Sequence, residues 1–387
     1  MFLIGLGHGA THWIAGTFYV LLPFMTKDLG LSYTQAGMLV SILHVSSFCA
    51  NIGSGAVVDM TGRRVVFQVV SLLVGGLALL MFGFTSLFLV LCAMVALIGA
   101  TNNLWHPPSL AFISEKYPEN RGYALSIHAT GASIGDMIAP LGAGAAIAWW
   151  SWQGSAVANA IPVFVVTAIF IFYLLPGDSK KQAVAGSATG FRSYLTDLGG
   201  LVRRKAVLGL CLMAALRSMA QNGLLMFLPL YLADVMKVSP VMLGAAIAGM
   251  HLGGVIVSPI AGILSDRIGR RPVVMSGLAA TTIIIAGLTF VDSAVVYVSA
   301  VSVLGFVLYA VRPVIHSWMM DMAPPEVRGS ATSLLFGTQA GLSVLMPLLG
   351  GAIADAYGLT EVFYFIAAIM FAANFVVFLL PGNRATA

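Results

Sequence analysis

Charged residues are scarce in this sequence. Asp, Glu, Lys and Arg together make up 9% of its 387 residues, whereas 59% of the residues are hydrophobic. A water-soluble domain of this length needs roughly a quarter of its residues charged to cover its surface. The composition therefore argues against a soluble globular protein and predicts an integral membrane protein.

Cysteine is also rare. Cys49, Cys92 and Cys211 all fall within long apolar runs. A cysteine in such a segment acts as a small hydrophobic side chain and not as part of a disulfide framework. We also find no phosphate-cradling loop and no nucleophile motif, so the sequence predicts neither an enzyme nor a cofactor.

Long apolar runs, in contrast, fill most of the chain. A helix needs about 20 mostly apolar residues to cross the hydrocarbon core of a bilayer. Strands of a membrane barrel would alternate polar and apolar residues, and runs such as "VVSLLVGGLALLMFGF" do not. We predict an all-α integral membrane protein with twelve transmembrane helices, at 2–26, 34–58, 65–85, 87–114, 122–149, 153–175, 206–233, 240–264, 272–291, 294–320, 329–355 and 361–380.

The positions of lysine and arginine predict how the chain crosses the membrane. Of 19 such residues, Arg217 and Arg312 fall inside spans, Lys27 and Lys237 lie in connections on one side, and the rest lie on the other side. Basic residues concentrate on the cytoplasmic side. We therefore expect a multi-pass protein of the inner (plasma) membrane with both termini cytoplasmic. The net charge of +5 then reflects topology and contact with anionic membrane lipid, and it predicts no nucleic-acid partner.

The two halves of the chain share identical residues at a constant offset of 207 positions. Such a repeat indicates an internal duplication, with two bundles related by an axis along the membrane normal. We predict a six-helix bundle at 1–175, a cytoplasmic linker at 176–205 and a second bundle at 206–387. In the first half the repeated residues include Gly37, His44, Gly55, Asp59, Gly62, Arg63 and Arg64; they align with Gly244, His251, Gly262, Asp266, Gly269, Arg270 and Arg271.

Two matching segments, "GAVVDMTGRR" and "GILSDRIGRR", carry a family signature. They resemble the loop motif Gly-x-x-x-Asp-(Arg/Lys)-x-Gly-Arg-(Arg/Lys) of the major facilitator superfamily, found between helices 2 and 3 and between helices 8 and 9. This resemblance covers essentially the whole chain. It implies two pseudo-symmetric bundles, a monomer, and a central cavity lined by helices 1, 4, 7 and 10.

A finer resemblance is to the fosmidomycin-resistance group of exporters. It rests on "GHGATHWIAGTFYVLLPFMTKDLGLSYTQAGMLVS" near the start and on "HPPSLAFISE" in the fourth predicted helix. The segment "GDMIAPLGAG" is also similar to the helix 5 motif of facilitator antiporters, although alanines replace two of its glycines. These similarities imply proton-coupled efflux.

The superfamily resemblance also implies that the repeated loop motif gates the cytoplasmic side. In that role Asp59 would dock against the start of helix 11, and the second copy would form a weaker contact with helix 5. The alternative is that these charges only fix topology, which would explain the arginines but not a repeated aspartate. The implied gating residues are Asp59, Arg63, Arg64, Asp266, Arg270 and Arg271.

Polar residues within the spans are the candidate binding residues, because a charge there costs roughly 2.5–3.5 kcal/mol. Arg217 and Arg312 lie about halfway along predicted helices 7 and 10, and each has a polar residue one turn later. Others fall on helices 1 and 4, which the resemblance places around the cavity. The predicted substrate-binding set is Arg217, Arg312, His8, His12, Asn103, Trp105, His106, Gln221, His316 and Tyr19.

Asp136 is the acidic residue deepest within a predicted span. It could carry the coupled proton, or it could be a permanent counter-ion of an arginine; histidines are rival proton carriers because they titrate near neutrality. His44 and His251 match each other in the repeat and could form structural hydrogen bonds or an outer gate. His128, near the inner end of its helix, is expected to be interfacial.

Metal binding is not predicted from the sequence. His8, His12 and His106 could approach one another, but no carboxylate or thiolate is arranged with them by spacing.

Taken together, these features predict a secondary transporter that moves a small organic solute by alternating access. Two buried arginines favour an anionic substrate, since a guanidinium recognises carboxylate or phosphonate with paired donors. Proton-coupled efflux is the first hypothesis, and proton-coupled uptake of a carboxylate is the second. A transporter-like receptor or assembly factor would keep the twelve spans but would not need two midplane arginines.

Overall fold

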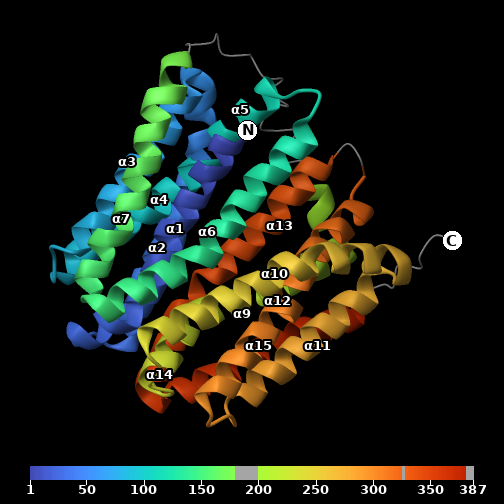
Figure 1. Ribbon diagram of the computed structural model, residues 1–387. Coiled ribbons are helices and arrows are strands. Elements are labelled where there is room, and N and C mark those ends of the chain that lie inside the picture. Colours follow the sequence, from blue (N-terminus) through green and yellow to red (C-terminus); the bar gives the residue numbers. More distant parts are fainter. Residues whose placement is uncertain (179–198, 325–326, 381–387) are drawn as a thin grey trace. The chain divides into compact units, whose positions relative to one another are not determined.

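The structure is a computed structural model that describes residues 1–178, 199–324 and 327–380. Within these ranges every element is helical (Figure 1), which confirms the predicted all-α fold. The chain divides into two compact units. The first comprises Met1–Gly186 with Leu232–Ala248, and the second comprises Ser187–Tyr231 with Gly249–Ala387.

The helices of the amino-terminal part agree with the predicted spans to within a few residues, except where a span is divided. They are α1 (Phe2–Asp28), α2 (Tyr33–Thr61), α3 (Arg64–Phe82), α4 (Phe88–Leu104), α5 (His106–Lys116), α6 (Arg121–Trp149) and α7 (Trp152–Ile169), followed by the short turns η1 (Phe170–Leu174) and η2 (Leu175–Gly177).

The carboxy-terminal part shows the same agreement. Its helices are α9 (Lys205–Asp234), α10 (Pro240–Ile268), α11 (Arg270–Leu288), α12 (Ala294–Met322), α13 (Arg328–Ser343), α14 (Leu345–Tyr357) and α15 (Leu359–Leu379). Most of the predicted linker, 179–198, lies outside the described residues.

Ten helical segments in the described ranges are long and apolar enough to cross a membrane. Helices α1 and α2 have similar lengths, 27 and 29 residues, but are not among the ten. In α1, the polar residues His8 and His12 lower the hydropathy of the segment. The weaker membrane signal of α1 therefore coincides with two candidate binding residues.

Local sequence explains several helix ends. Ser32 accepts a hydrogen bond from the Gln35 backbone N–H, and the Gln35 side chain bonds back to the Ser32 backbone, so a capping box begins α2. The loop-motif glycines Gly62 and Gly269 have φ angles of 64° and 95°. Only glycine adopts such angles readily, which is why the repeat keeps glycine at both turns.

Prolines divide two of the predicted spans. Pro107 and Pro108 follow His106 at the start of α5, and Pro347 follows the junction of α13 and α14. Each proline removes a backbone donor from the helical ladder. Each carbonyl oxygen four residues before such a proline therefore lacks its helical hydrogen bond and can accept one from another group. The carbonyl oxygen of Ser343, four residues before Pro347, is an example.

Helix α1 packs along α6 through glycine (Figure 1). A Cβ atom added at Gly131 would lie 2.0 Å from the Gly5 carbonyl oxygen, and one added at Gly135 would lie 2.3 Å from the Gly9 carbonyl oxygen. In a bilayer, helices associate by close packing because lipid is as apolar as the helix surface. The two Gly-x-x-x-Gly pairs therefore hold α1 and α6 at backbone contact.

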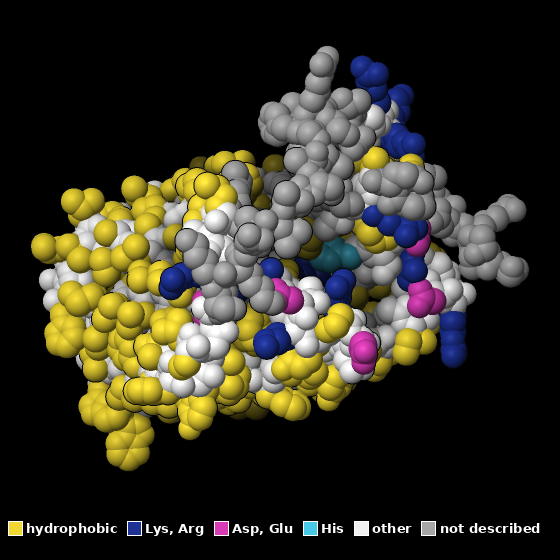
Figure 2. Space-filling model, turned by 90° about the horizontal axis from the view of Figure 1, so that it is seen from above, with side chains coloured by type: hydrophobic (Ala, Val, Ile, Leu, Met, Phe, Trp, Pro, Cys, Tyr) yellow, Lys and Arg dark blue, Asp and Glu magenta, His cyan; other side chains and the backbone are white. Residues whose placement is uncertain are grey.

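The surface is as expected for a protein that contacts lipid. Large hydrophobic side chains are exposed on several helices, including Leu89, Ile283 and Phe371. Figure 2 shows hydrophobic side chains over most of the left of the view, whereas charged side chains are seen mainly towards its middle and right. Such extensive apolar exposure is typical of a membrane-facing surface and not of a soluble monomer.

Candidate functional site: buried histidines and arginines

Four histidines from three helices meet inside the first unit. The rings of His8 and His128 stack with centroids 3.9 Å apart, and His8 makes edge contacts with His12 at 4.8 Å and with His106 at 5.0 Å. We call His8, His12, His106 and His128 the histidine cluster. His128 is only 4% exposed, because its side chain is turned inward against α1; its expected position at the membrane interface stays a prediction.

The structure also brings a carboxylate to this cluster. His12 Nδ1 lies 2.9 Å from Asp136 Oδ1 across 124 positions of sequence. Spacing along the chain gave no carboxylate beside the histidines, because it does not report contacts between α1 and α6. Both side chains are partly exposed, at 26% and 31%, so the pair is not sealed inside the first unit.

The polar residues at the end of α4 have different surroundings. The Asn102 amide donates to the Thr11 carbonyl oxygen at 3.3 Å, which links α4 to α1, and Asn103 is partly buried. Trp105 is fully buried and packs against Phe170. This indole lies in the core of the first unit, where it fixes the position of the adjacent His106.

Tyr19 contacts a histidine outside the cluster. Its hydroxyl lies 3.4 Å from His44 Nε2, and in the second unit the Tyr309 hydroxyl lies 3.1 Å from His251 Nδ1. Each of the two repeated histidines therefore has a tyrosine partner in its own unit. These bonds give both a structural role, and the outer-gate alternative stays a prediction.

In the second unit, Arg217 on α9 is 3% exposed. Its Nη2 atom donates to the Leu308 carbonyl oxygen on α12 at 2.8 Å, and its Nε is buried with no hydrogen-bond partner within the described residues. Arg312, one turn beyond Leu308, is close enough for the two charges to repel. Arg217 and Arg312, here called the arginine pair, form an electropositive centre.

The solvent exposure of Arg312 is informative, because this residue lies well inside a membrane-crossing helix. An arginine facing hydrocarbon would cost roughly 2.5–3.5 kcal/mol or more, so this side chain faces an aqueous space. Gln221 and His316 are partly buried, and the His316 ring meets the Phe336 ring edge-on at 5.0 Å. Both lie one turn beyond an arginine of the pair.

A polar group next to Arg217 was missed by the sequence analysis. The Asn222 amide donates to Ser343 Oγ at 2.9 Å, and Ser218 Oγ lies 3.1 Å from the same atom. The signal that could have identified Ser343 is Pro347, four residues later, which leaves the Ser343 carbonyl without its helical donor. This group joins α9 to the carboxyl end of α13.

The loop motifs make ion pairs within their own units. Arg64 pairs with Glu115 at the end of α5. Arg270 pairs with Asp266, and its Nε lies 3.0 Å from Asp321 Oδ2 near the end of α12. Glu115 and Asp321 were not singled out from the sequence. The pair of Arg64 with Glu115 links the start of α3 to the end of α5, and the pair of Arg270 with Asp321 links the start of α11 to the end of α12.

The remaining motif residues are described less completely. Arg63 is exposed, and the Arg271 guanidinium donates to the Phe378 carbonyl oxygen and lies 5.8 Å above that ring. The side chain of Asp59 lies outside the part of the structure that describes side chains. The predicted docking of Asp59 on helix 11 and of Asp266 on helix 5 stays a prediction.

An all-helical fold with apolar spans and polar groups deep inside its helices indicates a polytopic membrane protein, and comparison with known proteins gives its family. The family model of the Major Facilitator Superfamily matches residues 2–256 and 210–387. The chain belongs to this superfamily, and it is therefore a multi-pass integral membrane transporter of a small molecule and not an enzyme.

Several characterised relatives are similar over most of their length. The phosphoglycerate transporter protein of Salmonella typhimurium is 22% identical, with 93% of this chain and 83% of that protein covered. The multidrug resistance protein MdtG of Citrobacter koseri is 24% identical, with 90% and 86% covered. A bacterial homologue of the human lysosomal transporter Spinster superposes with a TM-score of 0.80 at 16% identity, covering 98% of this chain and 94% of the other.

Proposed function

We propose that the protein is a secondary active transporter that expels a small organic anion in exchange for protons. The main observation in favour of an anionic substrate is that the buried Arg217 lies beside Arg312 on an adjoining helix. Like charges at this depth repel strongly, because the local dielectric screens them poorly. A bound carboxylate, phosphonate or phosphate group supplies the missing negative charge.

Geometry within the second unit supports this substrate class. One donor of Arg217 is committed to the Leu308 carbonyl, which fixes the guanidinium plane, while Nε is buried without a partner in the described chain. A guanidinium held in this way presents its remaining donors in a planar fork. Neighbouring Gln221 and His316 can add single hydrogen bonds to the rest of the solute.

For the proton we propose Asp136 together with His12. Their contact joins an imidazole and a carboxyl, two groups that can carry a proton, at a partly exposed position. Movement of a proton on or off this pair changes the charge near the middle of the first unit. That change can be coupled to alternating access, in which the binding residues face one side of the membrane at a time.

The names of two relatives bear on the direction of transport and on the substrate. MdtG is named as a multidrug resistance protein, which supports export and agrees with the finer resemblance to fosmidomycin-resistance exporters. The Salmonella relative is named as a phosphoglycerate transporter, which supports a phosphorylated or carboxylated substrate. Uptake of an organic anion with protons is therefore the second candidate.

The test is a ligand screen followed by variants of the arginine pair. Purified protein in detergent is heated with carboxylates, phosphonates and phosphate monoesters, since a specific ligand raises the unfolding temperature. For the best anion, Arg217→Lys and Arg312→Lys should each weaken binding at least tenfold, because lysine keeps the charge but loses the planar fork. Arg217→Ala and Arg312→Ala should weaken binding of the anion still further.

The matched control is Arg267→Lys, at an exposed position near the end of α10 in the same unit. It should bind the anion like the wild type. If both alanine variants bind and transport with unchanged affinity, the anion proposal is wrong, and a neutral or cationic substrate replaces it.

A further inference from the structure

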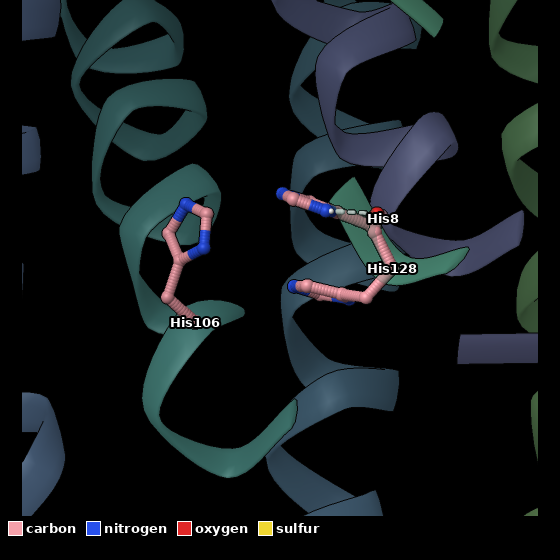
Figure 3. Close-up of side chains that lie close together, drawn as sticks. All are labelled: His8, His106 and His128. Carbon is pink, nitrogen blue, oxygen red and sulfur yellow. Dashed lines mark hydrogen bonds between the residues drawn. The ribbon is translucent and has the colours of Figure 1, made fainter. Parts of the chain in front are cut away.

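We propose that His8, His106 and His128 form a binding site for a divalent transition-metal ion of the zinc class. Each imidazole offers one ring nitrogen, and the three nitrogens lie within 4.8 Å of one another. Figure 3 shows the His8 and His128 rings stacked, with their outer ends directed towards His106. The proposal concerns a site that the anion-transport function does not require.

The first argument is the state of the ring nitrogens. His8 Nδ1 lies 2.8 Å from the His128 carbonyl oxygen, and a carbonyl can only accept, so Nδ1 carries the hydrogen. In the neutral ring the other nitrogen, Nε2, then presents a lone pair. This atom is buried and has no hydrogen-bond partner among the described residues. Metal-binding histidines usually have this arrangement: one ring nitrogen presents its lone pair to the metal, and the other donates a hydrogen bond to a carbonyl oxygen or a similar acceptor.

The second argument comes from His128. It lies near the backbone of Ile4, but both of its ring nitrogens are buried and neither reaches a hydrogen-bond partner within the described part of the chain. Buried polar atoms are nearly always bonded, so an unsatisfied one calls for an explanation. A metal ion at the outer ends of the two rings, on the side of His106, would satisfy Nε2 of His8 and one nitrogen of His128 together.

The third argument is the rigidity of the backbone that carries these ligands. His8 lies between Gly5 and Gly9, and His128 lies one turn before Gly131; these glycines bring α1 and α6 into backbone contact. The third ligand, His106, directly follows the fully buried Trp105. All three ligands therefore stand on anchored positions, as a preorganised site requires.

The distances are compatible with a metal ion if the stacked His8 and His128 rings rotate so that their lone pairs converge. Zinc binds imidazole nitrogen at about 2.0–2.1 Å, so two ligands of a tetrahedral ion are roughly 3.4 Å apart. The nitrogens, which lie up to 4.8 Å apart, must approach by about 1.4 Å in the widest case, a movement that rotation about the χ angles supplies.

Nearby charge favours a cation at this place. The His12 ring makes an edge contact with the His8 ring, and His12 Nδ1 contacts Asp136 Oδ1. The Asp136 carboxylate is therefore separated from the proposed ligands by the His12 side chain alone. Three protein ligands leave the fourth position of a tetrahedral ion open for water or for an oxygen of a solute. The partly exposed His12 and His106 mark the side from which an ion can enter.

The experiment uses full-length protein purified in detergent through an affinity tag that lacks histidine, stripped with chelator and titrated with Co²⁺. Cobalt reports tetrahedral nitrogen ligands through visible absorption, and calorimetry with Zn²⁺ gives the stoichiometry. We expect one ion per chain and a rise in the unfolding temperature on binding. His8→Gln, His106→Gln and His128→Gln should each weaken binding at least tenfold and reduce the cobalt absorption.

The matched control is His44→Gln, which removes a histidine of the same unit that bonds Tyr19 and lies outside the cluster. It should bind the metal like the wild type. Because His8 and His128 are buried, circular dichroism and the unfolding temperature without metal show whether each variant is folded, and His106→Gln, at a partly exposed position, tests the site independently. The proposal is overturned if the wild type binds no metal in a one-to-one ratio, or if folded His106→Gln binds as tightly as His44→Gln.

Discussion

At the scale of single residues, the candidate sites consist of polar side chains that lie within apolar helices. Composition alone marks Arg217, Asp136 and the membrane-embedded histidines, because polar groups there are costly. It could not pair His12 with Asp136, which is 124 positions away, or turn His128 towards His8. Those contacts depend on which faces of α1 and α6 meet, and one-dimensional spacing does not contain that information.

Asp136 gives the residue-scale prediction. Asp136→Asn keeps the shape of the side chain and a hydrogen-bond acceptor for His12, but it removes the titrating carboxyl. Transport in proteoliposomes should retain exchange of the substrate and lose accumulation driven by an imposed pH gradient. Because the His12–Asp136 contact is partly exposed, the loss of stability should be no more than about 1 kcal/mol.

The control for this variant is Asp28→Asn. Asp28 accepts a hydrogen bond from the Trp152 indole at the other end of α1, so its replacement perturbs α1 without touching the histidine cluster. Equal loss of exchange and of accumulation in Asp136→Asn would contradict the proton-carrier role and favour a permanent counter-ion.

At the scale of helices, the apolar runs in the sequence predicted well where the helices lie and how long they are. The observed ends of α1, α6, α9 and α12 fall within a few residues of the predicted spans. The breaks between α4 and α5 and between α13 and α14 were not predicted. Prolines were visible in both places, but a hydropathy window averages over them, and only the backbone ladder shows where a donor is missing.

The contact between α1 and α6 gives the element-scale prediction. Gly131→Ala would place a methyl group 2.0 Å from the Gly5 carbonyl oxygen, so the helices must separate. Overpacking of this kind costs roughly 1–3 kcal/mol, and the unfolding temperature in detergent should fall accordingly. Gly122→Ala lies on the same helix with nothing within 4 Å of the added carbon, and it should unfold like the wild type. Similar unfolding temperatures for the two variants would show that the close approach does not stabilise the protein.

At the scale of the whole molecule, the duplicated motif predicted the family before any fold was known, and the superfamily match confirms it. The bundle limits, the cytoplasmic termini and the gating role stay predictions. In the structure, the described ion pairs of the loop motifs, Arg64 with Glu115 and Arg270 with Asp321, lie within single units. Exposed pairs like these contribute about 0–1 kcal/mol each, so their importance for the protein would lie in the transport cycle more than in stability.

The gate gives the whole-molecule prediction. If Asp59 latches the protein during the cycle and does not touch substrate, Asp59→Asn should slow transport strongly while the affinity for the best anion, measured by thermal shift, stays within about twofold of the wild type. Asp266→Asn should slow transport less, because Arg270 still bonds Asp321 when Asp266 is neutral. Asp292→Asn, in the turn between α11 and α12, is a control outside the motifs and should transport normally. A parallel fall in affinity and rate for Asp59→Asn would place this residue in binding rather than in gating, since a latch acts on the rate of interconversion and leaves the binding contacts intact.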